Sequence, residues 1–302
     1  KIMAQWLAYG DPGIDTHEMD VSRFHPHNMD KNYIDIRASQ NYVEVYDIIH
    51  PLQQSEAPRN LKLSPFHKSQ QKLKANFVES AGWERPNWFD SNKKLLKKFN
   101  TSNFLRRGWE NKEWSPVAIV EHLQTRSNGG LFDLTPFTKI EVQGKGSLEF
   151  LNYIISNELD KPVGKVIYTS LLTQNGGVKC DLTITRLEKE KFLVISGGAM
   201  GLHDLYWIKS KLPTNSDIEI NNISNSMTAI GVWGPKSRDL LQKISGFDLS
   251  SSSFPYMSSK KILINKIECL ALRISYVGEL GWEIYAPTAK GHDLWDSIYN
   301  QS

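Results

Sequence analysis

The apolar residues beyond about residue 114 change repeatedly between helical and strand spacing. Leu148, Leu151 and Ile155 recur on one helical face, whereas Leu182 and Ile184 alternate with polar neighbours as in a half-buried strand. The same analysis predicts helices at 117–122, 202–212, 236–244 and 292–299, strand–turn–strand within 130–142, and strands at 192–196, 230–233 and 270–274. This irregular order predicts an α+β fold rather than a doubly wound parallel sheet. No internal repeat is evident.

The first 90 residues carry a different pattern, in which short helical stretches are separated by turn residues. Residues 1–7 are typical of an amphipathic helix, and a turn is expected at Asp11-Pro12-Gly13. A second helix is indicated over 33–48, and a third is expected from Ser64, as its N-cap, to Phe77. The aromatic segment 82–89 is too apolar for a free linker, so we expect it to pack between domains.

Both ends of the chain fall inside helical patterns. The chain starts with Lys1 rather than with an initiator methionine, and the apolar stripe from His292 to Tyr299 stops close to the last residue, Ser302. No signal or transit peptide is visible. We therefore expect the sequence to be a fragment of a longer protein.

Composition excludes several classes of protein. The 302 residues, 40% hydrophobic and 11% aromatic, suit a globular protein of one large or two ordinary domains. The formal charge of +3 implies no nucleic-acid partner, and the basic segment 91–99 is interpreted as a solvated helix face or loop. Two cysteines, Cys180 and Cys269, form no disulfide framework and favour a reducing compartment. No apolar run reaches the ~18–20 residues that cross a membrane, so no membrane partner is expected.

The segment Ser275-Tyr-Val-Gly-Glu-Leu-Gly-Trp-Glu-Ile-Tyr285 is the strongest candidate for a binding site. It leaves one apolar run, turns on Gly278 and Gly281, and enters another. These glycines permit backbone conformations closed to other residues. An acid just after such a turn can bind the N–H edge of a flat polar heterocycle through two parallel hydrogen bonds. The alternative is a β-hairpin with a polar turn.

A second candidate is the Gly176-Gly177 turn, which leads into a strand with Asp181 near its start. We expect Asp181 at the buried end of this strand, where an unpaired charge is costly and needs a partner or a function. The alternative is an aspartate that accepts hydrogen bonds from the turn backbone. Tyr168, which precedes the turn, either stacks on a ligand or fills the core. The histidines show no metal-ligand spacing, and no dinucleotide or P-loop motif occurs.

Together these motifs resemble the sarcosine and dimethylglycine dehydrogenase family, flavin-dependent enzymes that carry a folate-binding domain similar to glycine-cleavage T-protein. The similar elements, in the family's order, are Asp133–Lys139, the Gly-Gly turn with Asp181-Leu182, Trp233-Gly234-Pro235, Asp248–Pro255 and Gly278–Glu283. Residues 2–6 resemble the last helix of the family's flavin domain, and residues 64–66 and 82–89 resemble its central domain. The resemblance covers essentially the whole chain.

The resemblance implies three parts within an α+β architecture. Residues 1–27 would be the C-terminal remnant of an FAD-dependent oxidoreductase domain, 28–84 its central domain, and 85–302 a T-protein-like (aminomethyltransferase) folate-binding domain, truncated at its C-terminus. FAD would bind in the missing N-terminal domain. The intact parent would be a flavin-dependent N-demethylating oxidoreductase, and we expect this fragment alone to be inactive in amine oxidation.

In the family, an N-methyl amine is oxidised to an iminium ion, whose one-carbon unit passes to tetrahydrofolate. By resemblance, Asp181 is the catalytic acid near the folate N10 and the iminium, Glu283 binds the pteridine N–H edge, and Tyr168 and Tyr276 line the folate pocket. Thr185 stands where T-protein often has a tyrosine. The implied partners are the amine, folate and an electron-transfer flavoprotein, in the mitochondrial matrix if eukaryotic or the cytoplasm if bacterial.

Two other functions remain open. One is a non-catalytic role like that of the pyruvate dehydrogenase phosphatase regulatory subunit, in which the turn motif has lost its second acid; here Glu279 and Glu283 are both present. The other is a free-standing aminomethyltransferase, which residues 1–90 disfavour because they have no place in a lone T-protein.

Overall fold

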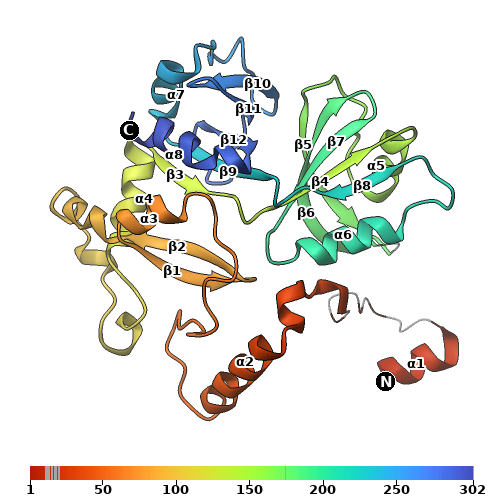
Figure 1. Cartoon of the computed structure of the whole chain (residues 1–302), viewed down its shortest axis with the longest axis horizontal. Helices are drawn as coiled ribbons and strands as arrows, with labels where there is room; N and C mark the ends of the chain where they lie inside the picture. The colour runs from red at the N-terminus through yellow and green to blue at the C-terminus, as the bar shows by residue number, and fades with distance from the viewer. Residues whose placement is uncertain (11–13, 15, 17–18, 20, 174, 302) are drawn as a thin grey trace.

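Two five-stranded antiparallel sheets dominate the computed structural model, which describes residues 1–10, 14, 16, 19, 21–173 and 175–301 (Figure 1). The predicted turn at Asp11-Pro12-Gly13 lies outside the described residues. Among the described residues, no helix combines the length and apolar character needed to cross a bilayer. Short 3₁₀ helices occur at η2 (Val21–Arg23), η3 (Pro26–Met29), η4 (Asp90–Lys97), η5 (Ser102–Phe104), η6 (Gly108–Asn111) and η7 (Thr288–Lys290).

Sheet I has the strand order β5-β6-β7-β4-β8. Its strands are β4 (Thr138–Gln143), β5 (Val166–Leu172), β6 (Val178–Glu188), β7 (Lys191–Ser196) and β8 (Glu219–Asn222). Helices α5 (Ser147–Ile154) and α6 (Gly201–Ser210) contribute to the apolar cluster on its outer face, with Phe150, Leu151 and Ile208 fully or nearly fully buried. The helical and strand spacings of this part of the sequence are therefore confirmed.

Sheet II has the order β10-β11-β12-β9-β3. Its strands are β3 (Gly130–Asp133), β9 (Met227–Trp233), β10 (Ser259–Ile264), β11 (Ile267–Leu272) and β12 (Gly281–Pro287). Helices α7 (Ser237–Ser245) and α8 (Gly291–Tyr299) cover its outer face through Leu241, Leu294 and Ile298. A third apolar cluster joins the inner faces of the two sheets, with Leu193 and Ile195 from sheet I and Trp233, Leu272 and Tyr285 from sheet II.

Helix α3 (His67–Lys72) and the hairpin β1 (Ala75–Ser80) and β2 (Trp83–Phe89) lie beside sheet II, and α4 (Val117–Ser127) follows them (Figure 1). The first helices, α1 (Ile2–Tyr9) and α2 (Lys31–Glu44), lie apart from sheet II in the lower part of the view. The segment 82–89, which we expected to be a connector, is a paired strand.

The third predicted helix is shorter than expected. It begins at His67 and not after Ser64, since residues 65–66 form a turn in which the Ser64 hydroxyl accepts from the amide of Phe66 and donates to Asp133. It ends at Lys72, since Lys74 takes a left-handed φ of 57° and redirects the chain into β1.

The two sheets repeat one topology, which corrects the sequence analysis. Repeat I (residues 138–208) runs β4-α5-β5-β6-β7-α6, and repeat II (residues 228–298) runs β9-α7-β10-β11-β12-α8, with equivalent strands in equivalent sheet positions. Identical residues lie ninety positions apart at both ends of the repeats: Thr138 and Thr228, Ile140 and Ile230, Val142 and Val232, Gly144 and Gly234, Ser147 and Ser237, Leu151 and Leu241, and Gly201 and Gly291. These identities are few and scattered, so the repeat cannot be recognised from the sequence without the fold.

The turn after the first strand of each repeat has the same backbone contacts. The amide of Gly144 donates to the carbonyl oxygen of Glu190 at 3.1 Å, and the amide of Gly234 donates to that of Leu280 at 2.8 Å. Both glycines have φ values that favour glycine, +115° and +134°. A Cβ on Gly144 would lie 2.1 Å from the Asp217 carbonyl oxygen, and one on Gly234 would lie 2.4 Å from the Cα of Gly129. No other residue fits either turn.

Gly144→Ala and Gly234→Ala are therefore each expected to lower the free energy of unfolding by roughly 3 kcal/mol or more, because each adds a backbone clash to a strained φ. Urea unfolding followed by tryptophan fluorescence measures this loss. Gly197→Ala is the matched control, since a Cβ there meets nothing within 4 Å. An unchanged unfolding midpoint for either of the first two variants would contradict the proposed equivalence of the turns.

Candidate functional site

Two of the predicted site residues lie side by side on sheet I. Tyr168 on β5 donates its phenol hydrogen to Oδ2 of Asp181 on β6, at 2.6 Å. The backbone partners are Tyr168 with Thr183 and Ser170 with Asp181, so the two side chains are diagonal neighbours on one face of the sheet. This hydrogen bond and the charge of Asp181 raise the pKa of the Tyr168 phenol. Tyr168 therefore stays a proton donor at neutral pH and holds the carboxylate in place.

Asp181 is exposed, whereas we expected it at the buried end of its strand. The reason lies in the length of β6. Its pairing with β7 begins only at Thr183, so Asp181 stands on a two-stranded extension that is paired with β5 alone. The carboxylate is thus open to solvent and to a ligand, and its charge needs no buried partner.

Tyr276 lies in the eight-residue connection from Arg273 to Leu280, which we call the 273–280 loop. Its side chain is 87% exposed. Among the described residues, no hydrogen bond or ring contact joins Tyr276 to the Tyr168–Asp181 pair, so its place beside them stays a prediction.

Glu283 lies elsewhere, in the interior between the two sheets. It is 4% exposed, and its Oε2 accepts a 2.6 Å hydrogen bond from the phenol of Tyr285, which is also buried. Alternation along β12 places both side chains on the inner face, while Trp282 and Ile284 pack outward. Among the ion pairs formed by the described residues, none includes Glu283.

Glu283 is buried with no cation beside it among the described residues, and this burial disfavours its charged form. Desolvation raises the pKa of its carboxyl to about 7, and the hydrogen bond from Tyr285 offsets part of this rise. The same burial, with the nearby Glu283 charge, raises the pKa of Tyr285 far above its ordinary value. A carboxylate in this position gains strongly from any ligand that brings N–H donors.

The structure thus separates the predicted residues into three places. Tyr168 and Asp181 lie together on the β5–β6 extension of sheet I, Tyr276 lies exposed in the 273–280 loop, and Glu283 lies in the interior. No contact among the described residues joins Glu283 to Asp181. By strand alternation, both acids belong to the inner faces of the two sheets, which face each other across the shared apolar cluster.

Sequence analysis assigned no role to Tyr285 or Arg126, and it noted Thr185 only as a departure from T-protein. Tyr285 binds Glu283, and the two-residue spacing along a strand could have revealed it. Thr185 is fully buried, and its hydroxyl has no partner among the described residues. Arg126 forms an ion pair with Glu279 of the 273–280 loop, and no local pattern could have indicated it because the two are far apart in sequence.

Two further ionisable groups are structural. Burial, with the charge of Asp204, raises the pKa of the Cys180 thiol. Lys139 is fully buried; its Nζ donates to the Thr135 carbonyl oxygen at 2.6 Å, and burial lowers its pKa to about 8. Asp133, in the same motif, accepts from Ser64 and Gln70 and so ties helix α3 to β3.

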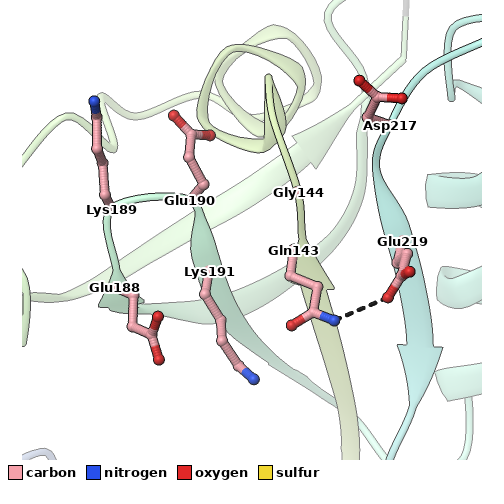
Figure 2. A pocket seen from close by; sticks show the side chains of 8 residues that line it. All are labelled: Gln143, Gly144, Glu188, Lys189, Glu190, Lys191, Asp217 and Glu219. Atoms are coloured by element: carbon pink, nitrogen blue, oxygen red, sulfur yellow. Dashed lines mark hydrogen bonds between the residues drawn. The ribbon is translucent and has the colours of Figure 1, made fainter.

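A cavity of about 430 Å³ lies at the β6–β7 turn, and it contains none of the predicted site residues. Figure 2 shows Glu219 accepting a hydrogen bond from Gln143 there, at 2.8 Å. Glu188, Glu190 and Asp217 also line it. The carboxylates form no cluster suited to a metal ion among the described residues.

Comparison with known families matches two parts of the chain. The family model of the GCVT N-terminal domain matches residues 66–302. The model of the FAD dependent oxidoreductase central domain matches residues 9–64.

Individual proteins agree with these matches. The chain is 31% identical to 4-methylaminobutanoate oxidase (formaldehyde-forming) of Paenarthrobacter nicotinovorans, over 99% of this chain and 35% of that protein. It is 30% identical to mitochondrial dimethylglycine dehydrogenase of Homo sapiens, over 99% of this chain and 34% of that protein. The chain thus spans about a third of the length of these relatives. The crystal structure of glycine cleavage system aminomethyltransferase T from Bartonella henselae shares the fold, with a TM-score of 0.62 at 23% identity over 79% of this chain and 57% of that one.

The raised pKa of Glu283 makes stability depend on pH. Between pH 4.5, the ordinary pKa, and about 7, the unfolded chain loses the proton of residue 283 while the folded chain keeps it. Stability of the wild-type chain therefore falls as pH rises through this window. Glu283→Gln, which still accepts from Tyr285, is expected to be more stable than wild type by up to about 3 kcal/mol at pH 8 and nearly equal at pH 4.

Thermal unfolding from pH 4 to 8 measures this difference. Glu268→Gln, at an exposed position on the neighbouring strand β11, is the control for removing one carboxylate. A Glu283→Gln variant that is equally destabilised at every pH would show that the carboxylate is compensated in the folded chain.

Proposed function

We propose, from the premise that this chain belongs to the GCVT N-terminal domain family, that it binds tetrahydrofolate and transfers to it the one-carbon unit of an oxidised N-methyl amine. The observation that carries the proposal is the buried Glu283 carboxyl, which has a tyrosine partner and no counter-cation among the described residues. Such a group is costly to the fold unless a ligand uses it.

The donor set at Glu283 fits the pteridine ring of folate. Tyr285 occupies Oε2 and fixes the orientation of the carboxylate. Adjacent ring and amino N–H groups of a pteridine would supply two parallel hydrogen bonds to it, the arrangement that carboxylates bind best. The unpartnered hydroxyl of Thr185, buried on the facing sheet, offers a further polar group in the same interior. The apolar surroundings suit a flat ring.

Asp181 would act at the reacting end of the ligand. Its charge would stabilise the iminium cation, and its free oxygen would accept the proton released when the amine of tetrahydrofolate attacks. The proton would then pass to the demethylated amine, which leaves as its bond to the one-carbon unit breaks. Tyr168 holds the other oxygen, so the carboxylate is oriented before the ligand arrives. Tyr276 would cover the ligand from the 273–280 loop, because its ring is exposed and the loop leads directly into the strand that carries Glu283.

The oxidation step belongs to the rest of a longer protein in this proposal. FAD chemistry there would convert the N-methyl amine to the iminium ion and pass electrons to an acceptor such as an electron-transfer flavoprotein. This sequence contains no dinucleotide-binding motif, so the chain is assigned only the capture of the one-carbon unit.

The domain boundaries at 27/28 and 84/85, and the inactivity of the chain alone in amine oxidation, stay predictions. A mitochondrial matrix location is proposed if the source is eukaryotic, and a cytoplasmic one if it is bacterial.

A regulatory role without catalysis is the second candidate. It would not require a tyrosine to orient Asp181, nor an uncompensated acid in the interior at Glu283. Both features are present, so we favour the enzymatic function.

Glu283→Ala is expected to weaken tetrahydrofolate binding by about 2–4 kcal/mol, because it removes a charged, doubly hydrogen-bonded acceptor. Titration calorimetry measures the loss. Affinity of the wild-type chain should also fall as pH drops below about 7, since a protonated carboxyl cannot accept both hydrogen bonds. Glu268→Gln is again the control. Wild-type affinity retained in Glu283→Ala would remove this residue from the site.

Asp181→Ala, placed in the intact longer protein, is expected to uncouple oxidation from capture. Amine oxidation should continue while formaldehyde replaces methylenetetrahydrofolate as the main product, because an uncaptured iminium ion hydrolyses. Product analysis with and without tetrahydrofolate gives the partition. Tyr168→Phe keeps the ring and removes only the hydrogen bond, so it should shift the partition less. An unchanged partition in Asp181→Ala would show that this aspartate is structural.

A further inference from the structure

The internal repeat shows where the 273–280 loop comes from. In repeat I, β6 and β7 are joined by a tight turn, with Glu188 paired to Lys191. At the equivalent place in repeat II, the eight residues 273–280 separate Leu272 of β11 from Gly281 of β12. The loop that carries Tyr276 therefore takes the place of both the end of β6, from Arg186 to Glu188, and the two-residue turn of the same scaffold.

Only part of the anchoring of this loop is inherited from the scaffold. The Leu280 carbonyl oxygen accepts from the amide of Gly234, as that of Glu190 accepts from Gly144 in repeat I. This contact fixes the last residue of the loop. At the other end, the indole N–H of Trp233 donates to the carbonyl oxygen of Ile274 at 2.9 Å. The equivalent residue of repeat I is Gln143, which has no indole N–H. Between these two contacts the loop has one further anchor.

Glu279 supplies that anchor. Its amide donates to the hydroxyl of Ser275 at 3.0 Å, which closes the loop on itself. Its carboxylate pairs with the guanidinium of Arg126, and the carboxylate side chain is only 13% exposed. The residue ninety positions earlier, Lys189, has the opposite charge. The Arg126–Glu279 pair is therefore specific to the repeat that carries the loop.

Arg126 extends from a well-fixed support. It lies in the last turn of α4, where a basic side chain also complements the helix dipole. Helix α4 is held to the front of the chain by Glu121, whose Oε1 accepts from the amide of Phe89 and from Asn92, both at 2.8 Å. The guanidinium is thus presented to the loop by an element that belongs to neither repeat.

We propose that Arg126 is a positioning residue, which holds the 273–280 loop through Glu279 and so fixes the segment that presents Tyr276 to a ligand. The expected effect on tetrahydrofolate binding rests on the proposed function, whereas the expected effect on hydrogen exchange of the loop does not. The Arg126 side chain is 53% exposed, so it contributes little to the stability of the whole fold. Its effect falls on the loop.

The test compares Arg126→Ala, Glu279→Gln and the charge-reversed pair Arg126→Glu with Glu279→Arg. Each single variant is expected to weaken tetrahydrofolate binding about tenfold and to speed hydrogen exchange of the loop amides from Tyr276 to Glu279, with the melting temperature nearly unchanged. The charge-reversed pair is expected to recover most of the affinity and the protection. A role in the stability of the whole fold would instead lower the melting temperature of each single variant.

Lys261→Ala, which removes an exposed cation on β10, is the control for net charge. Unchanged loop exchange in Arg126→Ala would overturn the proposal, as would a charge-reversed pair no better than the single variants. If the wild-type chain binds no tetrahydrofolate, the proposed function fails, and the exchange measurement alone then decides the role of Arg126.

Discussion

The close backbone approach at Gly234 is the constraint on which the site depends. The end of β9, the start of α7, the end of the 273–280 loop and the chain before β3 meet at this residue. Its amide and the hydroxyl of Ser237 both donate to the Leu280 carbonyl oxygen, each at 2.8 Å. Gly281 is equally restricted, because a Cβ there would lie 2.0 Å from the Val232 carbonyl oxygen. Two residues later the strand presents Glu283, so the position of the buried carboxyl follows from backbone contacts alone.

The buried carboxyl shows a conflict between folding and binding. The apolar cluster between the sheets stabilises the fold, yet Glu283 and the hydroxyl of Thr185 interrupt it. An apolar residue in either place would pack without an unsatisfied polar group. Proteins keep such groups where a ligand repays their cost. The exposed Asp181, by contrast, costs the fold little and is oriented by one tyrosine.

Much of the fold could be predicted from the sequence, because its elements have clear apolar periodicity. The strands around Ile140, Val194 and Ile230, and the helix beginning at Val117, lie where the pattern indicated. The errors have local causes. The helix expected up to Phe77 ends early because Lys74 takes a left-handed φ, which the sequence pattern could not indicate.

The site was less predictable than the fold. Glycine spacing and an acid indicated the 273–280 loop, and the hydrogen bond from Tyr168 to Asp181 joins two residues that were selected separately. The burial of Asp181 was wrongly expected, because the length of β7 beside β6 decides it. The role of Arg126 and the internal repeat depend on residues that meet only in three dimensions.

The repeat also shows where the scaffold can be modified. The entropy cost of a loop rises only slowly with its length. The tight turn at Lys189-Glu190 is therefore a natural insertion point for a second binding loop beside the cavity of Figure 2, ninety positions from the first.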